Sequence, residues 1–272
     1  MGLVTWAMTK IEVMPSLRKL FFIPVEDAGK LTLPPANSLK RRVVDECLVL
    51  NSHNLAAMLA EDWPRDFSDL KESLPPWTLI VCIAGYQRRP EERIHIMEKY
   101  LMEIFGDLGL KPQSTLHGAE GRESTIAVLL SDVWEKEPYW ILRYKRACHE
   151  IFFLTTLSQA SKFINLVEKI AARYSYPVKD IGCYVQPMVQ GRGCYLEFGF
   201  PSDGTAAEKS TEFEMFMDAS ETLMKNGAHF NRPYGPWAEM AYSRYAEGVK
   251  VLKKLKGIFD PNNILNPGKL CF

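Results

Sequence analysis

An arginine among aromatic residues is the first feature of this sequence that could recognise a ligand. Arg232 follows a helix stop at Gly227 and is braced by two prolines, with His229 and Tyr234 close by. A rigidly held guanidinium suits a planar anion because it donates bidentate hydrogen bonds. The alternative interpretation is a structural arginine that stacks on aromatic rings or pairs with Glu239. The residues alone leave both interpretations open.

Two adjacent titratable residues lie on an expected strand. His149 and Glu150 fall within Ala147–Leu157, a run rich in apolar residues. Because successive side chains of a strand point to opposite faces, only one of the two can face a given pocket. Glu150 is a candidate polar contact or proton acceptor, and the alternative is an ordinary carboxylate at a sheet edge.

The expected hairpin Gln186–Phe198 is the place to test for a metal site. It contains Gln186 and Glu197 but no histidine. One carboxylate and one amide are a poor ligand set for a transition metal, which prefers imidazole or thiolate ligands. Cys183 and Cys194 could face each other across the hairpin, although packed thiols are the better interpretation. We predict no metal site.

Glycine-rich phosphate-binding turns are missing from the sequence. Neither a GxGxxG run after a strand nor a Walker-type loop is present, and the glycines near the hairpin are explained by its turn. No histidine or cysteine stands in a motif for nucleophilic catalysis, and His53 and His117, at element boundaries, are expected to be surface or capping residues. We therefore expect weak or no dinucleotide binding by this chain alone.

The C-terminal segment has the most specific pattern. An amphipathic, lysine-rich run around residues 249–258 predicts a helix that stops at Asp260–Pro261. After the stop, Asn262–Asn263 and Pro267–Gly268 predict turns, and Ile264 and Leu265 are two expected apolar anchors. Such a tail is expected to be tied down rather than to fray.

The run DPNNILNPGK, from Asp260 to Lys269, resembles the closing signature of the FAD-linked oxidases of the vanillyl-alcohol oxidase and 4-cresol dehydrogenase superfamily. The resemblance covers nearly the whole chain as the family's cap domain and C-terminal helical segment, and it is strongest over 150–269. It implies that FAD is held mainly by an N-terminal FAD-binding domain that this chain lacks. GLVT at Gly2–Thr5 resembles the last strand of that domain, so we expect either a separate subunit or a fragment.

The resemblance also implies roles for individual residues. The cap would supply the pocket roof, and a Tyr-Arg pair of the cresol branch corresponds here to Asn231–Arg232, which keeps the anion anchor but puts a 4-hydroxybenzylic substrate in doubt. Covalent attachment of FAD through His149 is not expected, since Glu150 takes the place of the family's histidine. The expected substrate-binding residues are Arg232, Tyr234, His229, Gln186 and Glu197. The residues expected toward the cofactor are Glu150, His149, Asn266 and Lys269.

The implied function is that of the C-terminal, substrate-binding part of a FAD-dependent oxidoreductase. It would oxidise a small, anionic or aromatic hydroxylated substrate by hydride transfer to flavin, and it is not expected to be active alone. One alternative is a subunit of a 2-hydroxy-acid dehydrogenase of the D-lactate or glycolate type, which the histidine-free hairpin argues against. The other is a non-catalytic interaction module that retains the cap fold.

Composition limits the partners. The 272 residues are 47% hydrophobic and 24% charged, with 33 basic and 33 acidic side chains, so the chain is globular and no net charge draws it to nucleic acid. No apolar run is long enough for a membrane span, and six cysteines without a CxxC pair suggest reduced thiols in the cytoplasm. A FAD-binding domain or subunit is the expected partner, and an exposed cap edge favours association, including a homo-oligomer.

The order of elements predicts an α+β fold. Alternating strand and helix patterns recur as β-α-β-β-α in two ferredoxin-like halves, about 15–116 and 147–226, which predicts an antiparallel sheet with flanking helices. The first half includes strands at Leu17–Glu26, Glu46–Asn51 and Trp77–Tyr86, a helix from Pro90, and a polar insertion at residues 53–76. A helix over about 206–226 closes the second half. A connector at 117–146 joins the halves, so the cap spans 1–226 and a C-terminal helical segment spans 227–272.

Overall fold

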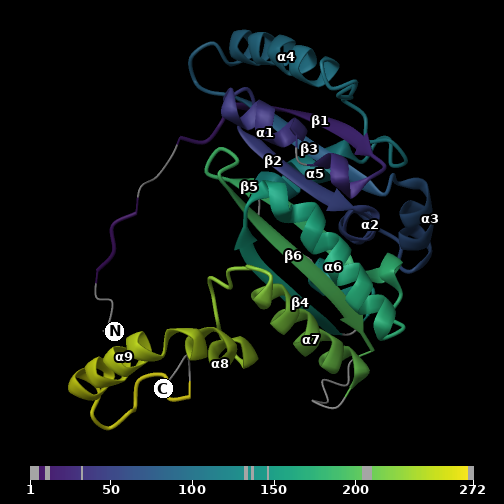
Figure 1. The fold of residues 1–272 in the computed structure, drawn as a ribbon. Coiled ribbons are helices and arrows are strands. Elements are labelled where there is room, and N and C mark those ends of the chain that lie inside the picture. Colours follow the sequence, from purple (N-terminus) through teal and green to yellow (C-terminus); the bar gives the residue numbers. More distant parts are fainter. Residues whose placement is uncertain are drawn as a thin grey trace.

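A single antiparallel sheet runs through the molecule (Figure 1). The computed structural model describes residues 6–9, 13–31, 33–131, 134–135, 138–145, 147–203 and 210–268. Its six strands confirm the predicted antiparallel α+β fold. They are β1 (Leu17–Val25), β2 (Glu46–Asn51), β3 (Trp77–Gly85), β4 (Ala147–Thr155), β5 (Gly182–Met188) and β6 (Gly193–Ser202).

The order of strands across the sheet is β1-β3-β2-β5-β6-β4. Each half has the chain order β-α-β-β-α, and the two halves meet through β2 and β5, so the third strand of each half lies between its first and second. The helices of the first half are α1 (Leu33–Lys40) and α4 (Pro90–Gly106). Those of the second are α6 (Ala160–Arg173) and α7 (Thr211–Lys225); the predicted start of α7 at 206–209 lies outside the described residues.

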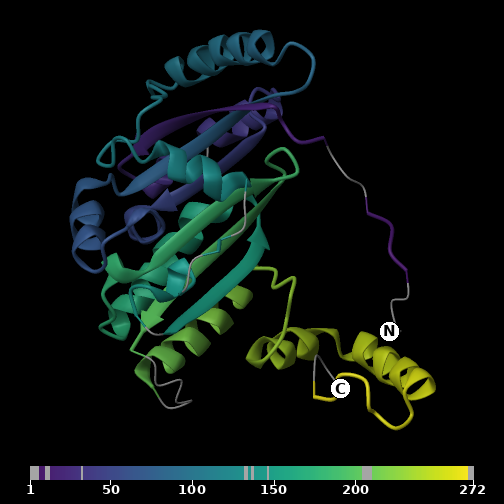
Figure 2. The same ribbon diagram turned by 180° about the vertical axis from the view of Figure 1, so that it is seen from behind.

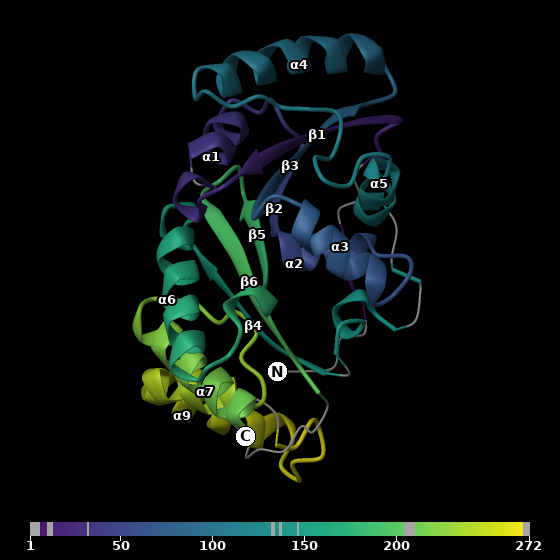
Figure 3. The same cartoon turned by 90° about the vertical axis from the view of Figure 1, so that its right-hand side faces the viewer.

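Helices cover the sheet on both faces (Figures 2 and 3). On one face, α1, α4, α6 and α7 pack on inward-pointing strand residues such as Phe153, Leu196 and Phe198. α6 forms because Phe163, Ile164, Val167 and Ile170 recur at helical spacing and are all buried. On the other face, α2 (Ser52–Leu59), α3 (Arg65–Ser73) and α5 (Glu123–Ser131) form a second core.

Short 3₁₀ helices connect several elements, at Ala28–Leu31, Trp140–Leu142, Leu157–Gln159, Val178–Asp180 and Ser243–Tyr245. The segment 53–76, expected to be a polar insertion, instead contains most of α2 and all of α3. Asn51 starts α2 because its side chain accepts a hydrogen bond from the backbone N–H of Asn54.

The two halves share a short backbone ladder. Only two residue pairs join β2 to β5, namely Val49 with Val185 and Leu50 with Tyr184. The flanking pairs β2–β3 and β5–β6 are longer, with six and seven residue pairs. The seam between the halves is therefore the weakest junction of the sheet in backbone hydrogen bonds.

The side chain of Asn51 continues this seam. Its Nδ2 donates to the carbonyl of Ile181 at 2.7 Å, and its Oδ1 accepts from the backbone N–H of Cys183 at 3.0 Å. A carboxamide offers one donor and one acceptor in the same arrangement as a peptide group, so it takes the place of the next ladder position. Gly182 fits between because a Cβ there would lie 2.1 Å from Oδ1 of Asn54.

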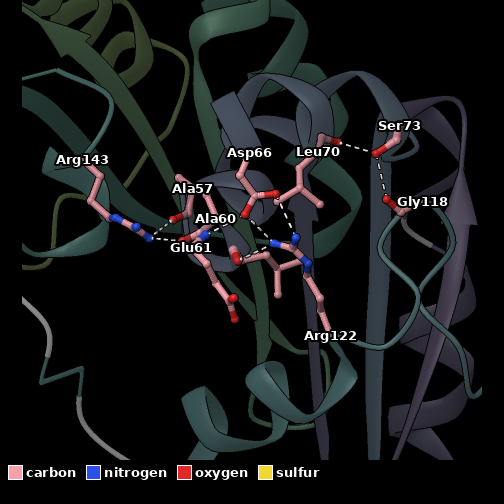
Figure 4. Close-up of polar contacts among 10 residues, drawn as sticks. Ala57, Ala60, Glu61, Asp66, Leu70, Ser73, Gly118, Arg122 and Arg143 are labelled. Carbon is pink, nitrogen blue, oxygen red and sulfur yellow. Dashed lines mark hydrogen bonds and ion pairs between the residues drawn. The ribbon is translucent and has the colours of Figure 1, made fainter. Parts of the chain in front are cut away.

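Two arginines of the connector hold the end of α2 (Figure 4). Arg143 donates to the carbonyl of Ala60 at 2.6 Å, and Arg122 donates to the carbonyl of Leu59 at 3.0 Å. Arg122 also contacts both carboxylate oxygens of Asp66, at 2.7 and 2.8 Å. The last carbonyls of a helix lack intrahelical donors, so these guanidiniums satisfy them and fasten the connector to α2 and α3.

A buried histidine lies between the halves, contrary to the expectation that it would be a surface or capping residue. His53 is only 3% exposed and contacts the rings of Phe67 and Tyr144 edge-on. Burial, and next the charge of Lys71, lower its pKa to about 3. Lys71 in turn donates to Asp180 at 2.6 Å, which links α3 of the first half to the entry of β5.

The C-terminal segment consists of α8 (Pro236–Tyr242), α9 (Ala246–Phe259) and the loop after it, which project from the body of the sheet (Figures 1 and 2). The predicted stop at Asp260 is confirmed. Its carboxylate accepts from the backbone N–H groups of Ile264 and Leu265 at 3.0 and 2.9 Å, and the buried Lys256 donates to it as well. The loop is thus tied to its own helix.

The two expected apolar anchors of the tail, Ile264 and Leu265, are exposed in the described structure. Ile264 is 74% exposed and contributes through its backbone rather than its side chain. Asn263, Asn266 and Gly268 have φ angles of 49°, 50° and 70°. Asparagine and glycine tolerate this left-handed conformation best, which explains the spacing of the motif. Lys269 lies outside the described residues.

The segment Gly2–Thr5, which resembles a strand of the FAD-binding domain, lies outside the described residues, and residues 6–9 and 13–15 belong to no strand. Among the described helices, none combines the length and the apolar character needed to cross a bilayer.

Candidate functional site

The sheet face opposite α6 and α7 carries a row of side chains that crosses the second half. Phe152 on β4 pairs with Glu197 on β6, Glu197 pairs with Tyr184 on β5, and Tyr184 pairs with Leu50 on β2. Alternation along each strand puts these side chains on one face, while their neighbours point into the core under the helices. The sheet therefore brings together residues from four separate segments of the chain.

Glu197 is the central acid of this row. Tyr195, two positions earlier on the same strand, donates its hydroxyl to Oε2 of Glu197 at 2.5 Å. Burial raises the pKa of Glu197, while the Tyr195 hydrogen bond and the positive charge of Arg232 act in the opposite direction. At neutral pH, the free-energy difference between the protonated and ionised forms of Glu197 is therefore smaller than it would be in water.

Glu150 lies on the same face of β4, opposite Gly199 of β6. It remains accessible to solvent. Protein atoms nevertheless crowd its carboxyl, and this loss of hydration, followed by the negative charge of Glu197, raises its pKa to about 7. A carboxyl that titrates near neutral pH can both accept and release a proton under ordinary conditions.

Glu150 and Glu197 form a carboxyl pair, and Arg232 lies near its Glu197 member, where its positive charge opposes the rise in the pKa of that acid. Its guanidinium stacks over the ring of Phe152 at 4.9 Å, and Tyr234 packs 6.0 Å from the same ring. Of the ion pairs and hydrogen bonds among the described residues, none joins Arg232 to Glu239 or occupies its N–H groups. The stacking alternative is therefore realised, and the guanidinium donors stay available to a ligand.

A backbone bridge places Arg232. His229 and Leu154 exchange two backbone hydrogen bonds, of 2.8 and 2.9 Å, which add the segment after α7 to the edge of β4. Trp237 then packs on Phe152 at 5.1 Å and donates to Ser220 at 2.9 Å. The side chain of His229 is exposed, so this residue contributes mainly through its backbone.

The other expected site residues are dispersed. Gln186 is on the same face two positions further along β5, opposite Tyr195, and it lines a polar cavity of about 600 Å³ near the hairpin that shares Tyr184 with the cavity at Glu197. His149 lies on the opposite face from Glu150, against Phe213 and Phe216 of α7. Asn266 lies in the loop after α9, and it is not among the groups that influence Glu150 or Glu197.

His149 illustrates the effect of strand alternation. Its ring centroid is 5.6 Å from that of Phe216, burial lowers its pKa, and its Nε2 has no hydrogen-bond partner among the described residues. The sequence argument that His149 and Glu150 cannot share a face is therefore confirmed. In the described residues, no group of three or more potential metal ligands occurs.

Sequence reasoning missed the tyrosines of the site. Tyr195 holds Glu197, Tyr184 lies next to it, and Tyr139 of the connector interacts electrostatically with both carboxyls. The signal for Tyr184 and Tyr195 was their alternation with buried residues on the hairpin strands. Tyr139 could have been suspected from the aromatic pair that it forms with Trp140 in the sequence.

The chain is similar to known proteins in its C-terminal segment and in its fold. Residues 236–270 match the family model "FAD linked oxidases, C-terminal domain", which covers α8, α9 and the Asp260 loop. The fold is similar to that of p-cresol methylhydroxylase with substrate bound, with a TM-score of 0.66 and 14% identity over 95% of this chain and 53% of the other. It is also similar to alkyldihydroxyacetonephosphate synthase, with a TM-score of 0.52 and 12% identity over 93% and 45%.

No protein with curated annotation matches the sequence significantly. The chain spans about half the length of the solved structures that it matches. The match of residues 236–270 confirms the resemblance to the C-terminal domain of FAD-linked oxidases in that segment, and along the chain the solved structures share the fold.

Proposed function

We propose that this chain is the substrate-binding cap of a FAD-dependent oxidoreductase, and that it acts on a hydroxylated substrate with an anionic or aromatic group. The observation that carries the proposal is the cluster of Arg232, Glu150 and Glu197 on the face of β4, β5 and β6 opposite α6 and α7, which we call the open face. It combines a guanidinium with free donors and a carboxyl whose pKa is raised to about 7. The fold likeness to a substrate-bound oxidase supports it.

The residues of this chain fit contact with a flavin ring rather than retention of the whole cofactor. The open face presents Glu150 and Tyr139 with partly accessible side chains. The sequence offers no glycine-rich turn to hold a pyrophosphate. We therefore place the phosphate contacts on a FAD-binding domain or subunit, the partner that this proposal requires.

The chemistry of the cap residues follows from their charges. Flavin, when bound, supplies the hydride acceptor. Arg232 binds and orients the anionic or aromatic end of the substrate, because its donors form a planar fork. Glu150 accepts the hydroxyl proton as the carbon loses its hydride, since its pKa near neutrality lets the ionised form exist beside Glu197. Tyr195 holds the orientation of Glu197.

Of the alternatives, the 2-hydroxy-acid dehydrogenase subunit gains no support from the hairpin Gln186–Phe198, which contains no histidine. The non-catalytic module is separated from our proposal by the experiment below.

Co-purification of flavin tests the proposed function. We expect the tagged chain, purified alone, to show no flavin absorbance, and the same chain purified from its native source to carry a flavoprotein with a visible flavin spectrum. Strong flavin retention by the isolated chain would contradict the proposal that a separate domain or subunit holds the cofactor. Absence of any flavin from the native complex would favour the non-catalytic module.

Arg232 provides a second test on the isolated chain. We expect Arg232→Gln to weaken binding of benzoate, a planar anion, by about tenfold or more, because a charge-assisted bidentate contact contributes about 1.5–3 kcal/mol. Arg232→Lys should restore little of this, since an ammonium group cannot reproduce the fork. Isothermal titration calorimetry measures the change.

Arg173→Gln is the matched control, because Arg173 is an exposed arginine of α6 whose guanidinium pairs with Asp218 at 2.9 Å. Its benzoate affinity should equal that of the unmodified chain. Equal weakening by both substitutions would show that benzoate responds only to net charge and that Arg232 is not an anion anchor.

A further inference from the structure

A cavity of about 570 Å³ on the open face of the sheet reaches Glu197, one member of the carboxyl pair. Its floor is formed by strand residues of β2, β3, β5 and β6, and its opposite wall by α5, α2 and the connector. Such a volume lies within the range of small-molecule sites. The described lining residues are Leu48, Leu50, Met58, Ile80, Ile126, Leu129, Leu130, Trp134, Tyr139, Trp140, Tyr184 and Glu197.

The lining is apolar except at one end. Among the described lining residues, Glu197 is the only carboxyl, and Tyr139 and Tyr184 are the only others with a side-chain oxygen. Both tyrosines lie next to Glu197, by strand pairing for Tyr184 and by electrostatic interaction for Tyr139. The polar groups therefore gather where the cavity meets the carboxyl pair, and the remainder is aliphatic or aromatic.

The row of paired residues from Phe152 to Leu50 sets the length of a ligand that would contact both Arg232 and the apolar part of the cavity. Arg232 stacks on Phe152 of β4, whereas the apolar part of the cavity lies over Leu50 of β2. Three inter-strand steps separate β4 from β2, and at about 4.8 Å each they span roughly 14 Å. A single six-membered ring is too short to contact Arg232 and fill the cavity at the same time.

We propose that the substrate of this site is an elongated amphiphile, with its polar end between Arg232 and the carboxyl pair and an apolar body in the cavity. This names the substrate class of the proposed function and rests on it. The walls belong to two layers of one chain, the sheet and α5 with the connector, so the space suits a slender molecule rather than the surface of a protein partner. The aromatic side chains provide large apolar contact area for such a body.

A series of straight-chain alkanoates, from butanoate to decanoate, tests the inference on the isolated chain by calorimetry. Each methylene that enters an apolar cavity gains about 0.8 kcal/mol, so we expect the Kd to fall about three- to fourfold per methylene until the cavity is filled. Equal affinity for butanoate and decanoate would overturn the inference.

Cavity-filling variants separate the cavity from unspecific binding. Leu130→Trp on α5 and Met58→Trp on α2 fill the space from two elements, so a folding defect in one leaves the other informative. Each variant should retain butanoate binding, and its Kd should depend much less on the length of the alkanoate chain. Val128→Trp is the control on α5, because Val128 is 56% exposed and does not line this cavity. It should keep the full dependence.

If Leu130→Trp, Met58→Trp and Val128→Trp all show the same fall in Kd per methylene as the unmodified chain, the apolar body binds elsewhere and the inference is wrong. Failure of flavin co-purification would remove the proposed function but leave these slopes unchanged, because no flavin takes part in the titrations. The two failures are therefore distinguishable.

Discussion

Replacing Asn51 by alanine should lower the free energy of unfolding by about 3 kcal/mol. The substitution removes the N-cap of α2, which contributes about 1 kcal/mol. It also leaves the carbonyl of Ile181 and the N–H of Cys183 without partners at the seam between the halves. Buried groups without partners cost about 1–3 kcal/mol each, offset in part if water enters. Urea unfolding, with an unchanged slope, measures the loss.

Asn226→Ala is the matched control for this prediction. Asn226 also makes a side-chain hydrogen bond, from Nδ2 to the carbonyl of Thr222 at 2.9 Å, but it is exposed at the end of α7. Water can replace that bond, so the expected loss is about 0.5 kcal/mol or less. A loss for Asn51→Ala no larger than that of Asn226→Ala would show that the carboxamide does not hold the halves together.

Acidification should destabilise the fold through His53. Its pKa is about 3 in the folded chain and about 6.5 when unfolded, so the unfolded state binds more protons between these values. The contribution of the neutral His53 to the free energy of unfolding is therefore fully present above about pH 6.5, and it is lost as the pH decreases toward 3. Between about pH 7.5 and about pH 4.5, this one group should remove about 3 kcal/mol of stability.

The variant His53→Phe isolates this effect. Phenylalanine keeps an aromatic ring against Phe67 and Tyr144 but cannot take up a proton. The variant should lose about 3 kcal/mol less than the unmodified chain over the same pH range, as measured by urea unfolding at both ends. His95→Phe, at an exposed position of α4, should leave the pH dependence unchanged. Parallel pH profiles for the His53 variant and the unmodified chain would refute the role of His53.

The strands could be predicted because each carries its own signal. The run Trp77–Gly85 is apolar throughout and proves to be the fully buried β3, while the runs at β1 and β2 were predicted within one residue. What no single strand indicates is its partner. The pairing of β2 with β5 joins residues more than 130 positions apart, and only two residue pairs and one carboxamide determine it.

Helices α2 and α3 were missed for a different reason. The segment contains tryptophan, prolines and several charges, which suggest a loop. Its helices are stabilised from outside, by the Asn51 cap and by Arg122 and Arg143 of the connector. Those contacts also explain why His53 is buried, since the connector supplies Tyr144 to cover it. Local sequence patterns do not contain such long-range contacts.

The candidate site, like the fold, could be predicted only in part from the sequence. Glu150, Glu197 and Arg232 could be selected because charged residues beside apolar strands or aromatic clusters are unusual. Their neighbourhood depends on strand register, which also moved Gln186 away from the group and His149 to the other face. The apolar cavity could not be foreseen, because its walls come from α5 and the connector, whose position over the sheet the sequence does not specify.

The bridge between His229 and Leu154 determines where a ligand's charged end meets the acids. These two backbone hydrogen bonds are the attachment of the Arg232 segment to the edge strand. If the segment slid along β4 by two residues, the guanidinium would move about 6.6 Å, further than a hydrogen bond can reach. Under the proposed function, a change in the length of the turn at Gly227 would therefore shift Arg232 relative to Glu197 and alter substrate preference while every proposed contact residue is kept.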